Sequence, residues 1–177
     1  MILSPTMYPT KPQNQQARTP TQLMGLPPGA QGVRRTLEIM VGLIDHFKTD
    51  IIIREKALSL VARLSPKNFD GEIRALFNFV KNNIRYVRDI AGVETVSWPT
   101  KTLEYKQGDC DDKVVLLGSL LEAIGFKTRL VAIGPRAGVY THVYIQAYHG
   151  GEWVSLETTE NVEAGWEPPE FVSKMII

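Results

Sequence analysis

Residues 108–125, GDCDDKVVLLGSLLEAIG, decide how this chain of 177 residues folds. An apolar side chain recurs at every third or fourth position, a spacing that predicts an amphipathic helix over residues 110–124. Gly125 follows directly, as is typical where a helix ends. The single cysteine of the chain, Cys110, is therefore expected at the N-terminus of this helix. The predicted apolar stripe consists of Val114, Leu117, Leu120, Leu121 and Ile124.

Three more helices are predicted upstream of this segment. The same spacing of apolar residues marks residues 37–47 as an amphipathic helix. Asp50 and Asp70 are expected to cap a second and a third helix, because a carboxylate at a helix start accepts hydrogen bonds from free backbone N–H groups. The stretch after the third helix contains Gly92 and Pro99 and is predicted to be a loop.

Downstream of the cysteine helix, the periodicity changes from helical to alternating. Residues 129–133, 141–148 and 152–156 are rich in β-branched and aromatic side chains, which predicts three strands. Residues 149–151, His-Gly-Gly, are expected to form the turn of a hairpin. Residues 171–177 are either a further strand or a docking tail. Helices followed by an antiparallel sheet indicate an α+β fold.

The first 33 residues differ in composition from the rest of the chain. Six of the 11 prolines lie there, and the first acidic residue of the chain is Glu38. A segment with many prolines and few apolar side chains cannot form a core, so residues 1–33 are expected to be an extended arm. The arm is either a flexible tail or a segment that binds other protein subunits and orders on them. Residues 34–177 are expected to form one domain.

Charge and composition exclude several classes of partner. The net charge is +1, from 20 basic and 19 acidic residues, so the whole chain has no electrostatic attraction to nucleic acid or to a membrane surface. No apolar run approaches the ~20 residues of a transmembrane helix, and no secretory signal is visible. One cysteine excludes an internal disulfide and a multi-cysteine metal site. We therefore expect no cofactor, no nucleic acid and no membrane as partners, and a reducing compartment is permitted.

The position of Cys110 at a helix start favours chemical reactivity of its thiol. Free backbone N–H groups and the positive end of the helix dipole both stabilise a thiolate at a helix start, and the same N–H groups can bind an oxyanion. Three acidic neighbours, Asp109, Asp111 and Asp112, act in the opposite direction, because like charges raise the pKa of a thiol. A thiolate at this position therefore needs a cation close by.

A histidine and a glutamate on the predicted hairpin can complete a catalytic group. If the hairpin turns at residues 149–151 and pairs residue i with roughly residue 299 minus i, Glu157 lies opposite His142. By alternation, His142 shares a face with Tyr140 and Tyr144. A carboxylate next to an imidazole fixes its tautomer and stabilises its protonated form. Cys110, His142 and Glu157 are therefore predicted to be the nucleophile, the base and the orienting acid.

Other interpretations of the same residues stay open. A lone cysteine is most often a small buried apolar residue, and a lone histidine is often an ordinary surface residue. Cys110, His142 and Glu157 could also hold zinc with one open position. For a donor to an oxyanion, the candidates are Trp98, Gln107 and the backbone N–H of Cys110. Trp98 is also explained as an anchor that is partly buried in its loop.

Four segments together resemble one enzyme superfamily. They are Gly108–Lys113, the Leu-rich helix that ends in Gly125-Phe-Lys-Thr-Arg129, the strand Thr141–Tyr144, and Trp153–Thr159. Over residues 103–159 the chain strongly resembles the transglutaminase-like, papain-related cysteine enzymes, and residues 77–86 resemble the helix that precedes their core. The resemblance covers roughly residues 70–160, which it implies are the core of the domain. The resemblance implies Cys110 as the nucleophile, His142 as the general base and acid, and Glu157 as the orienting acid, where the family usually has Asp.

The resemblance leaves two functions to weigh. It implies an enzyme that acts on an amide bond of a protein or peptide, as a peptidase, an amidase or an acyltransferase. Small proteins with this core, including the Asp-Cys-Asp-Asp-Lys form, are similar to ones found among bacteriophage and prophage morphogenesis proteins. The alternative is therefore a structural subunit of a phage particle that binds its neighbours through residues 1–33. The expected location is the cytoplasm of a bacterial host or the virion.

Overall fold

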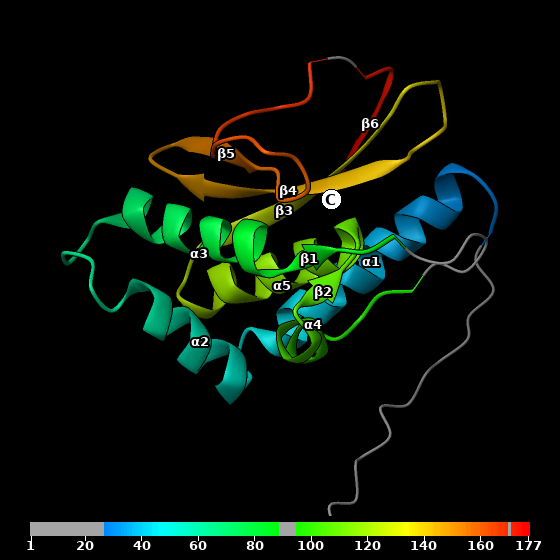
Figure 1. Ribbon diagram of the computed structural model, residues 1–177. Coiled ribbons are helices and arrows are strands. Elements are labelled where there is room, and N and C mark those ends of the chain that lie inside the picture. Colours follow the sequence, from blue (N-terminus) through cyan, green and yellow to red (C-terminus); the bar gives the residue numbers. More distant parts are fainter. Residues whose placement is uncertain (1–26, 89–94, 170) are drawn as a thin grey trace, which may run out of the picture.

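The computed structural model describes residues 27–88, 95–169 and 171–177, and it confirms the predicted α+β fold (Figure 1). The larger helices precede a four-stranded antiparallel sheet. None of the helices within these ranges has the length and apolar character needed to cross a membrane. The elements in chain order are α1 (Ala30–Phe47), α2 (Ile51–Val61), α3 (Phe69–Asn83), β1 (Arg85–Tyr86), α4 (Pro99–Tyr105), β2 (Gln107–Gly108), α5 (Cys110–Ala123), β3 (Lys127–Gly134), β4 (His142–His149), β5 (Glu152–Leu156) and β6 (Ser173–Ile176).

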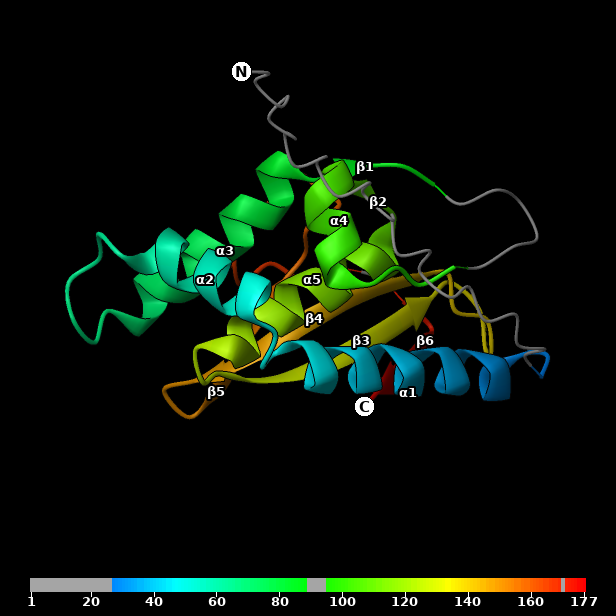
Figure 2. The same cartoon turned by 90° about the horizontal axis from the view of Figure 1, so that it is seen from below.

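α5 is the central helix of the fold. It packs against all four other helices and against β3 and β4, and Figure 2 shows it with α1 on one side and α2, α3 and α4 on the other. The predicted apolar stripe was too narrow, because Val115 and Leu116 are also fully buried. A helix that is apolar on every side belongs in a core rather than on a surface. This burial fixes the position of Cys110 at the N-terminus of α5.

The sheet has the strand order β5-β4-β3-β6, with every neighbouring pair antiparallel. Gly150 and Gly151 form the hairpin turn before β5, and both have positive φ angles (63° and 91°), which glycine adopts without a steric penalty. Of the two predictions for residues 171–177, the added strand is confirmed, since β6 pairs with β3. One face of the sheet packs on α5, and a smaller cluster of Val131, Ile133 and Tyr144 packs separately with Phe171.

The helix caps follow the prediction in one case and depart from it in another. Asp50 caps α2 as predicted, since its Oδ1 accepts hydrogen bonds from the backbone N–H groups of Ile52 and Ile53. The prediction of Asp70 as the cap of α3 was wrong. Asn68 occupies that position and accepts a hydrogen bond from the backbone of Gly71 at 3.1 Å. Asn and Asp cap helices about equally well, so the sequence did not separate these positions.

The segment before α5 was predicted to be a loop, but it contains a helix and a short strand. α4 occupies Pro99–Tyr105, with Pro99 at its start, where the missing N–H costs nothing. β1 and β2 form a short parallel pair, in which Arg85 lies opposite Gln107. Pro99 was the available signal for α4, and the shortness of the helix concealed its periodicity. Gly92 lies outside the described residues.

The boundary of the N-terminal arm differs from the prediction. α1 begins at Ala30, so its first turn lies inside the segment that was assigned to the arm. The apolar periodicity of α1 becomes visible only from Leu37, which explains the late predicted boundary. Residues 1–26 lie outside the described residues, so the arm itself stays a prediction.

Gly134, at the end of β3, offers a test of the packing beside the loop that leads to β4. A Cβ atom at this position would lie 1.8 Å from the backbone oxygen of Val139, and backbone cannot move aside as a side-chain end can. We expect Gly134→Ala to lower the free energy of unfolding by about 2 kcal/mol or more. Gly42→Ala in α1 meets no atom within 4 Å and should raise it by about 0.5–1 kcal/mol. Urea denaturation of both variants measures the difference.

Candidate active site

Cys110 is the first residue of α5, and the local sequence explains why the helix begins there. Asp109 is the N-cap, and its Oδ1 accepts a hydrogen bond from the backbone N–H of Asp112 at 3.1 Å. The cysteine side chain is partly buried and packs at the edge of the main core. The backbone of Val143 on β4 lies close enough to the sulfur to lower the pKa of the thiol. The helix start and the start of β4 therefore meet at the thiol.

Three influences raise the pKa of Cys110 above its ordinary value. Burial is the largest, followed by the negative charges of Asp111 and Asp109. The thiol also donates a hydrogen bond to Oδ1 of Asp111 at 3.5 Å, which raises the pKa further, while the nearby backbone of Val143 acts in the opposite direction. An isolated Cys110 would therefore stay protonated near neutral pH. To become a thiolate, it needs a group that accepts its proton and carries positive charge.

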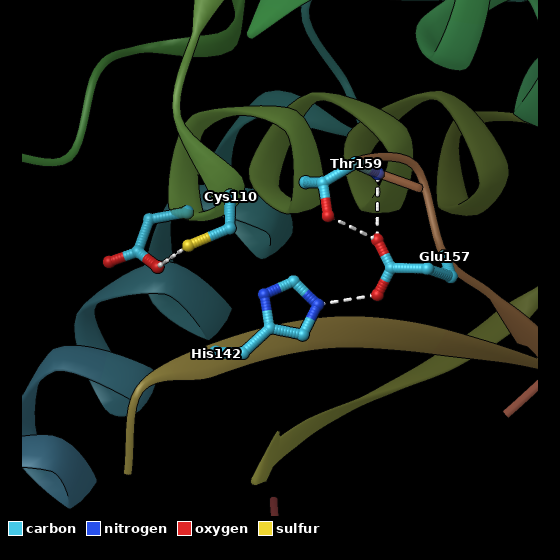
Figure 3. Close-up of polar contacts among 5 residues, drawn as sticks. Cys110, His142, Glu157 and Thr159 are labelled. Carbon is cyan, nitrogen blue, oxygen red and sulfur yellow. Dashed lines mark hydrogen bonds and ion pairs between the residues drawn. The ribbon is translucent and has the colours of Figure 1, made fainter. Parts of the chain in front are cut away.

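His142 lies beside Cys110 and forms a hydrogen bond with Glu157. The distance between Nε2 of His142 and Oε2 of Glu157 is 2.5 Å. Figure 3 shows the imidazole between the cysteine and the glutamate, with its other nitrogen, Nδ1, on the side of the sulfur. One ring nitrogen is therefore held by the carboxylate, and the other is available to exchange a proton with the thiol.

The predicted contact between His142 and Glu157 is present, although the predicted register was wrong. The residue numbers of each pair in the hairpin add up to 301 instead of 299, as in His149↔Glu152 and Ile145↔Leu156. Glu157 follows the last paired residue of β5 and reaches His142 diagonally rather than from directly opposite. Diagonal neighbours lie ~7–8 Å apart, a gap that a long side chain spans. The tight Gly150–Gly151 turn sets this register.

Strict alternation does not describe the start of β4 either. Tyr140 packs against the main core, whereas Tyr144 belongs to the separate cluster with Val131 and Ile133. The two tyrosines that His142 was predicted to share a face with therefore lie in different clusters. Tyr140 precedes the first residue of β4, where the regular pleat that alternation assumes has not yet begun.

Glu157 is almost fully buried, with 1% of its surface exposed. Its Oε1 accepts hydrogen bonds from both the backbone N–H and the hydroxyl of Thr159, each at 2.7 Å. Burial alone raises the pKa of the carboxyl, but the bonds from His142 and Thr159 outweigh it, and the pKa is lowered. The glutamate is therefore ionised and held in place, as an orienting acid must be.

Lys113 is a further charged residue near this carboxylate, and it is 2% exposed. Its Nζ donates a hydrogen bond to the backbone oxygen of Ile84 at 3.1 Å. Burial lowers the pKa of Lys113 to about 8, and the charge of Glu157 counteracts part of that effect. No role was predicted for Lys113 or Thr159 from the sequence. Both residues lie in the segments that carry the family resemblance, Lys113 three residues after Cys110 and Thr159 two residues after Glu157, and this position was the available sign of a role.

The acidic residues around Cys110 have separate structural tasks. Asp109 caps α5, and Asp112 accepts a hydrogen bond from the backbone N–H of Ser97 at 2.7 Å, which ties the preceding loop to the helix. In the described part of the chain, Asp109, Cys110 and Asp111 form the one group whose side-chain atoms lie close enough together to bind a metal. That group does not include His142 or Glu157, so it differs from the zinc site considered above.

Trp98 and Gln107 both lie near the start of α5, but each has another contact. The ring of Trp98 packs against Phe47, with centroids 5.6 Å apart, which agrees with its interpretation as a loop anchor. The side-chain oxygen of Gln107 accepts a hydrogen bond from Arg85 at 2.8 Å. Both therefore stay candidates as oxyanion donors, and the backbone N–H at the start of α5 is the third.

Removing the charge of Asp111 tests its effect on the thiol. Because this charge raises the pKa of Cys110, Asp111→Asn should lower that pKa and increase the thiolate fraction at pH 7. We expect alkylation by iodoacetamide at pH 7 to become about three- to tenfold faster. Asp70→Asn, which removes an exposed carboxylate elsewhere, is the matched control and should leave the rate unchanged. An unchanged rate in Asp111→Asn would show that this carboxylate does not act on the sulfur.

Comparisons with known proteins were made for sequence and for structure. The family model described as "Transglutaminase-like superfamily" matches residues 57–158, more than half of the chain. A search among curated proteins finds no match. A "putative protease" from Parabacteroides distasonis has a TM-score of 0.57 at 15% identity, over 70% of this chain and 26% of that one. A "putative cysteine protease" from Cytophaga hutchinsonii has a TM-score of 0.54 at 13% identity, over 78% and 55%.

These comparisons bear on the fold and on the family of the chain. The two solved structures share the fold, and the chain spans about a quarter of the first and about half of the second. The matched family segment contains α5 with Cys110, the strand with His142, and Glu157. The chain therefore belongs to the transglutaminase-like superfamily.

Proposed function

We propose that the protein is a cysteine enzyme that acts on an amide bond, with Cys110, His142 and Glu157 as its catalytic triad. The observation that carries the proposal is the hydrogen bond between His142 and the buried, ionised Glu157, next to the only cysteine of the chain. A base that is oriented by an acid beside a nucleophile is the arrangement that acyl transfer requires.

In the proposed reaction, Nδ1 of His142 accepts the proton of Cys110 as the sulfur attacks the substrate carbonyl carbon. Glu157 stabilises the resulting imidazolium through Nε2. The backbone N–H at the start of α5 donates to the oxyanion, with Trp98 or Gln107 as a second donor. The imidazolium then protonates the leaving amine, which yields a thioester on Cys110. Water or a second amine attacks this acyl-enzyme and releases the thiol.

The substrate of the proposed reaction is a protein or peptide. The names of the two solved structures, a "putative protease" and a "putative cysteine protease", support an amide in a polypeptide. Hydrolysis and transfer to an amine share the acyl-enzyme, so the products of both reactions should be measured. Fluorescein-labelled casein reports hydrolysis, and incorporation of a fluorescent amine into casein reports transfer.

Cys110→Ala tests this proposal in that pair of assays. Because the thioester needs the sulfur, we expect the variant to lose the activity entirely, whichever of the two assays detects it. Circular dichroism of the variant shows that the loss is not a loss of fold. Amide turnover that persists in Cys110→Ala would contradict the proposal.

A second candidate function is a structural role in a phage particle, in which the chain keeps the fold of the enzyme without its activity. The raised pKa of Cys110, caused by burial and by Asp111 and Asp109, favours it, because such a thiol is a poor nucleophile on its own. Residues 1–33 would then bind neighbouring subunits. Deletion of residues 1–26 should abolish assembly with the other subunits if this role is correct, and assembly that survives the deletion would contradict it.

A further inference from the structure

A depression of about 440 Å³ lies beside the candidate active site, on the side of Glu157. Its walls come from the end of α3, from β1, from α5 and from the segment that follows β5. Thr159 belongs to its lining, and the same residue donates two hydrogen bonds to Glu157. Lys113 also lines it and lies three residues, about one helical turn, after Cys110. The depression is therefore adjacent to the triad.

Three cations line this depression, and one carboxylate, Glu160, accompanies them. The cations are Lys81, Arg85 and Lys113, so the lining has an excess of positive charge. Positive side chains around a concave surface raise the local concentration of anions and bind carboxylates through charge-assisted hydrogen bonds.

The three cations donate hydrogen bonds to neutral oxygen atoms, and these bonds do not neutralise their positive charges. Lys81 donates to the backbone oxygen of Val162 at 2.6 Å, Arg85 to the side chain of Gln107 at 2.8 Å, and Lys113 to the backbone oxygen of Ile84 at 3.1 Å. All three acceptors are neutral. Within residues 27–88, 95–169 and 171–177, no carboxylate oxygen lies within 4.0 Å of their nitrogen atoms.

The burial of Lys113 makes this arrangement more than a cluster of surface charges. A lysine that is 2% exposed and lacks a carboxylate in direct contact is costly for the fold, since burial disfavours its charged form. Glu157 acts on Lys113 only through the electric field of its negative charge. A bound carboxylate in the depression would supply the missing counter-charge.

We propose that this depression is a substrate subsite that binds a carboxylate group near the scissile amide. The inference rests on the proposed function, and it makes the substrate a peptide that carries a carboxylate near the bond that is cleaved. The carboxylate comes either from an Asp or Glu side chain or from a free C-terminus. Lys81 and Arg85 bind it from the rim, and Lys113 supports them from the wall next to the triad.

The test is a titration of the full-length ¹⁵N-labelled protein with three peptides, followed by NMR. The peptides are acetyl-Ala-Glu-Ala-amide, acetyl-Ala-Gln-Ala-amide, and acetyl-Ala-Gln-Ala with a free carboxylate. At low salt, we expect the Glu peptide to bind about tenfold more tightly than the Gln amide, with shifts in the amides of residues 82–86 and 158–161. If the third peptide binds more tightly than the Glu peptide, the carboxylate that is recognised is a C-terminus.

Variants decide whether the three cations cause the preference. The double variant Lys81→Met, Arg85→Met should reduce the preference to less than about twofold. The double variant Arg63→Met, Arg74→Met removes the same charge from exposed positions outside the lining and should keep the preference. Equal binding of all peptides, no binding, or a preference that survives in the first double variant overturns the proposal. The titration does not use the thiol, so its failure is distinct from a failure of the Cys110→Ala test.

Discussion

Replacement of His142 by Ala is expected to lower kcat/KM for amide turnover by about 10³-fold or more. The reason is that His142 has two tasks, since it accepts the proton of Cys110 and later protonates the leaving amine. The neighbourhood of Cys110 makes the loss larger, because burial, Asp111 and Asp109 all raise the pKa of the thiol. Without an imidazole to take the proton, little thiolate forms near neutral pH.

The control for this variant is the other histidine of the same strand. His149 ends β4, far along the strand from Cys110, and its Nε2 lies 3.7 Å from Asp70. His149→Ala should therefore keep kcat/KM within about twofold of the wild type. Steady-state kinetics on the peptide or amine substrate that the casein assays identify measure both variants. Equal losses in the two variants would indicate a general effect on the strand rather than a catalytic role for His142.

Replacement of Glu157 by Gln has the second largest expected effect. The amide keeps the size of the side chain but removes the negative charge that stabilises the imidazolium, so we expect kcat/KM to fall by about 10²- to 10⁴-fold. Glu152→Gln, at the exposed start of β5, removes a charge without touching the triad and should leave the rate unchanged. A rate for Glu157→Gln within about threefold of the wild type would show that the acid does not orient the histidine.

The same variant changes how stability depends on pH. The pKa of Glu157 lies below the ordinary value of 4.5, because the bonds from His142 and Thr159 outweigh the effect of burial. The ionised carboxylate therefore stabilises the fold above about pH 4.5, and this contribution is lost as the pH falls through the lower pKa of the folded state. Urea titrations between pH 3 and pH 7 should show a weaker loss of stability on acidification in Glu157→Gln than in the wild type.

Much of the fold could be predicted because the apolar periodicity is strong where the core is built. The spacing in residues 108–125 located α5, and alternation located β3, β4 and β5. The elements that were missed or misplaced are short or depend on geometry in three dimensions. α4 has seven residues, too few for a clear period, and the burial of α5 on every side depends on partners that no local pattern reveals.

In the candidate site, too, local sequence patterns identified some residues, and others became visible only in the three-dimensional structure. Cys110 stood out because it is the only cysteine and begins a helix, and the hairpin placed His142 near Glu157. The error of two residues in the register went unnoticed in that prediction, because the long side chain of Glu157 reaches diagonally. Thr159 and Lys113 act on the site through burial and hydrogen bonds, which sequence spacing does not contain.

The most direct test of the central claim, that Cys110 and His142 act as a pair, is the pH dependence of Cys110 alkylation by iodoacetamide in the wild type and in His142→Ala. We expect the apparent pKa of the reaction in the wild type to lie well below the ~8.5 of a free cysteine and to rise in His142→Ala. The rise would follow from the loss of the imidazolium, whose positive charge acts against the effects of burial, Asp111 and Asp109 on the thiol. Slow alkylation with a high apparent pKa that is the same in both proteins would contradict the claim.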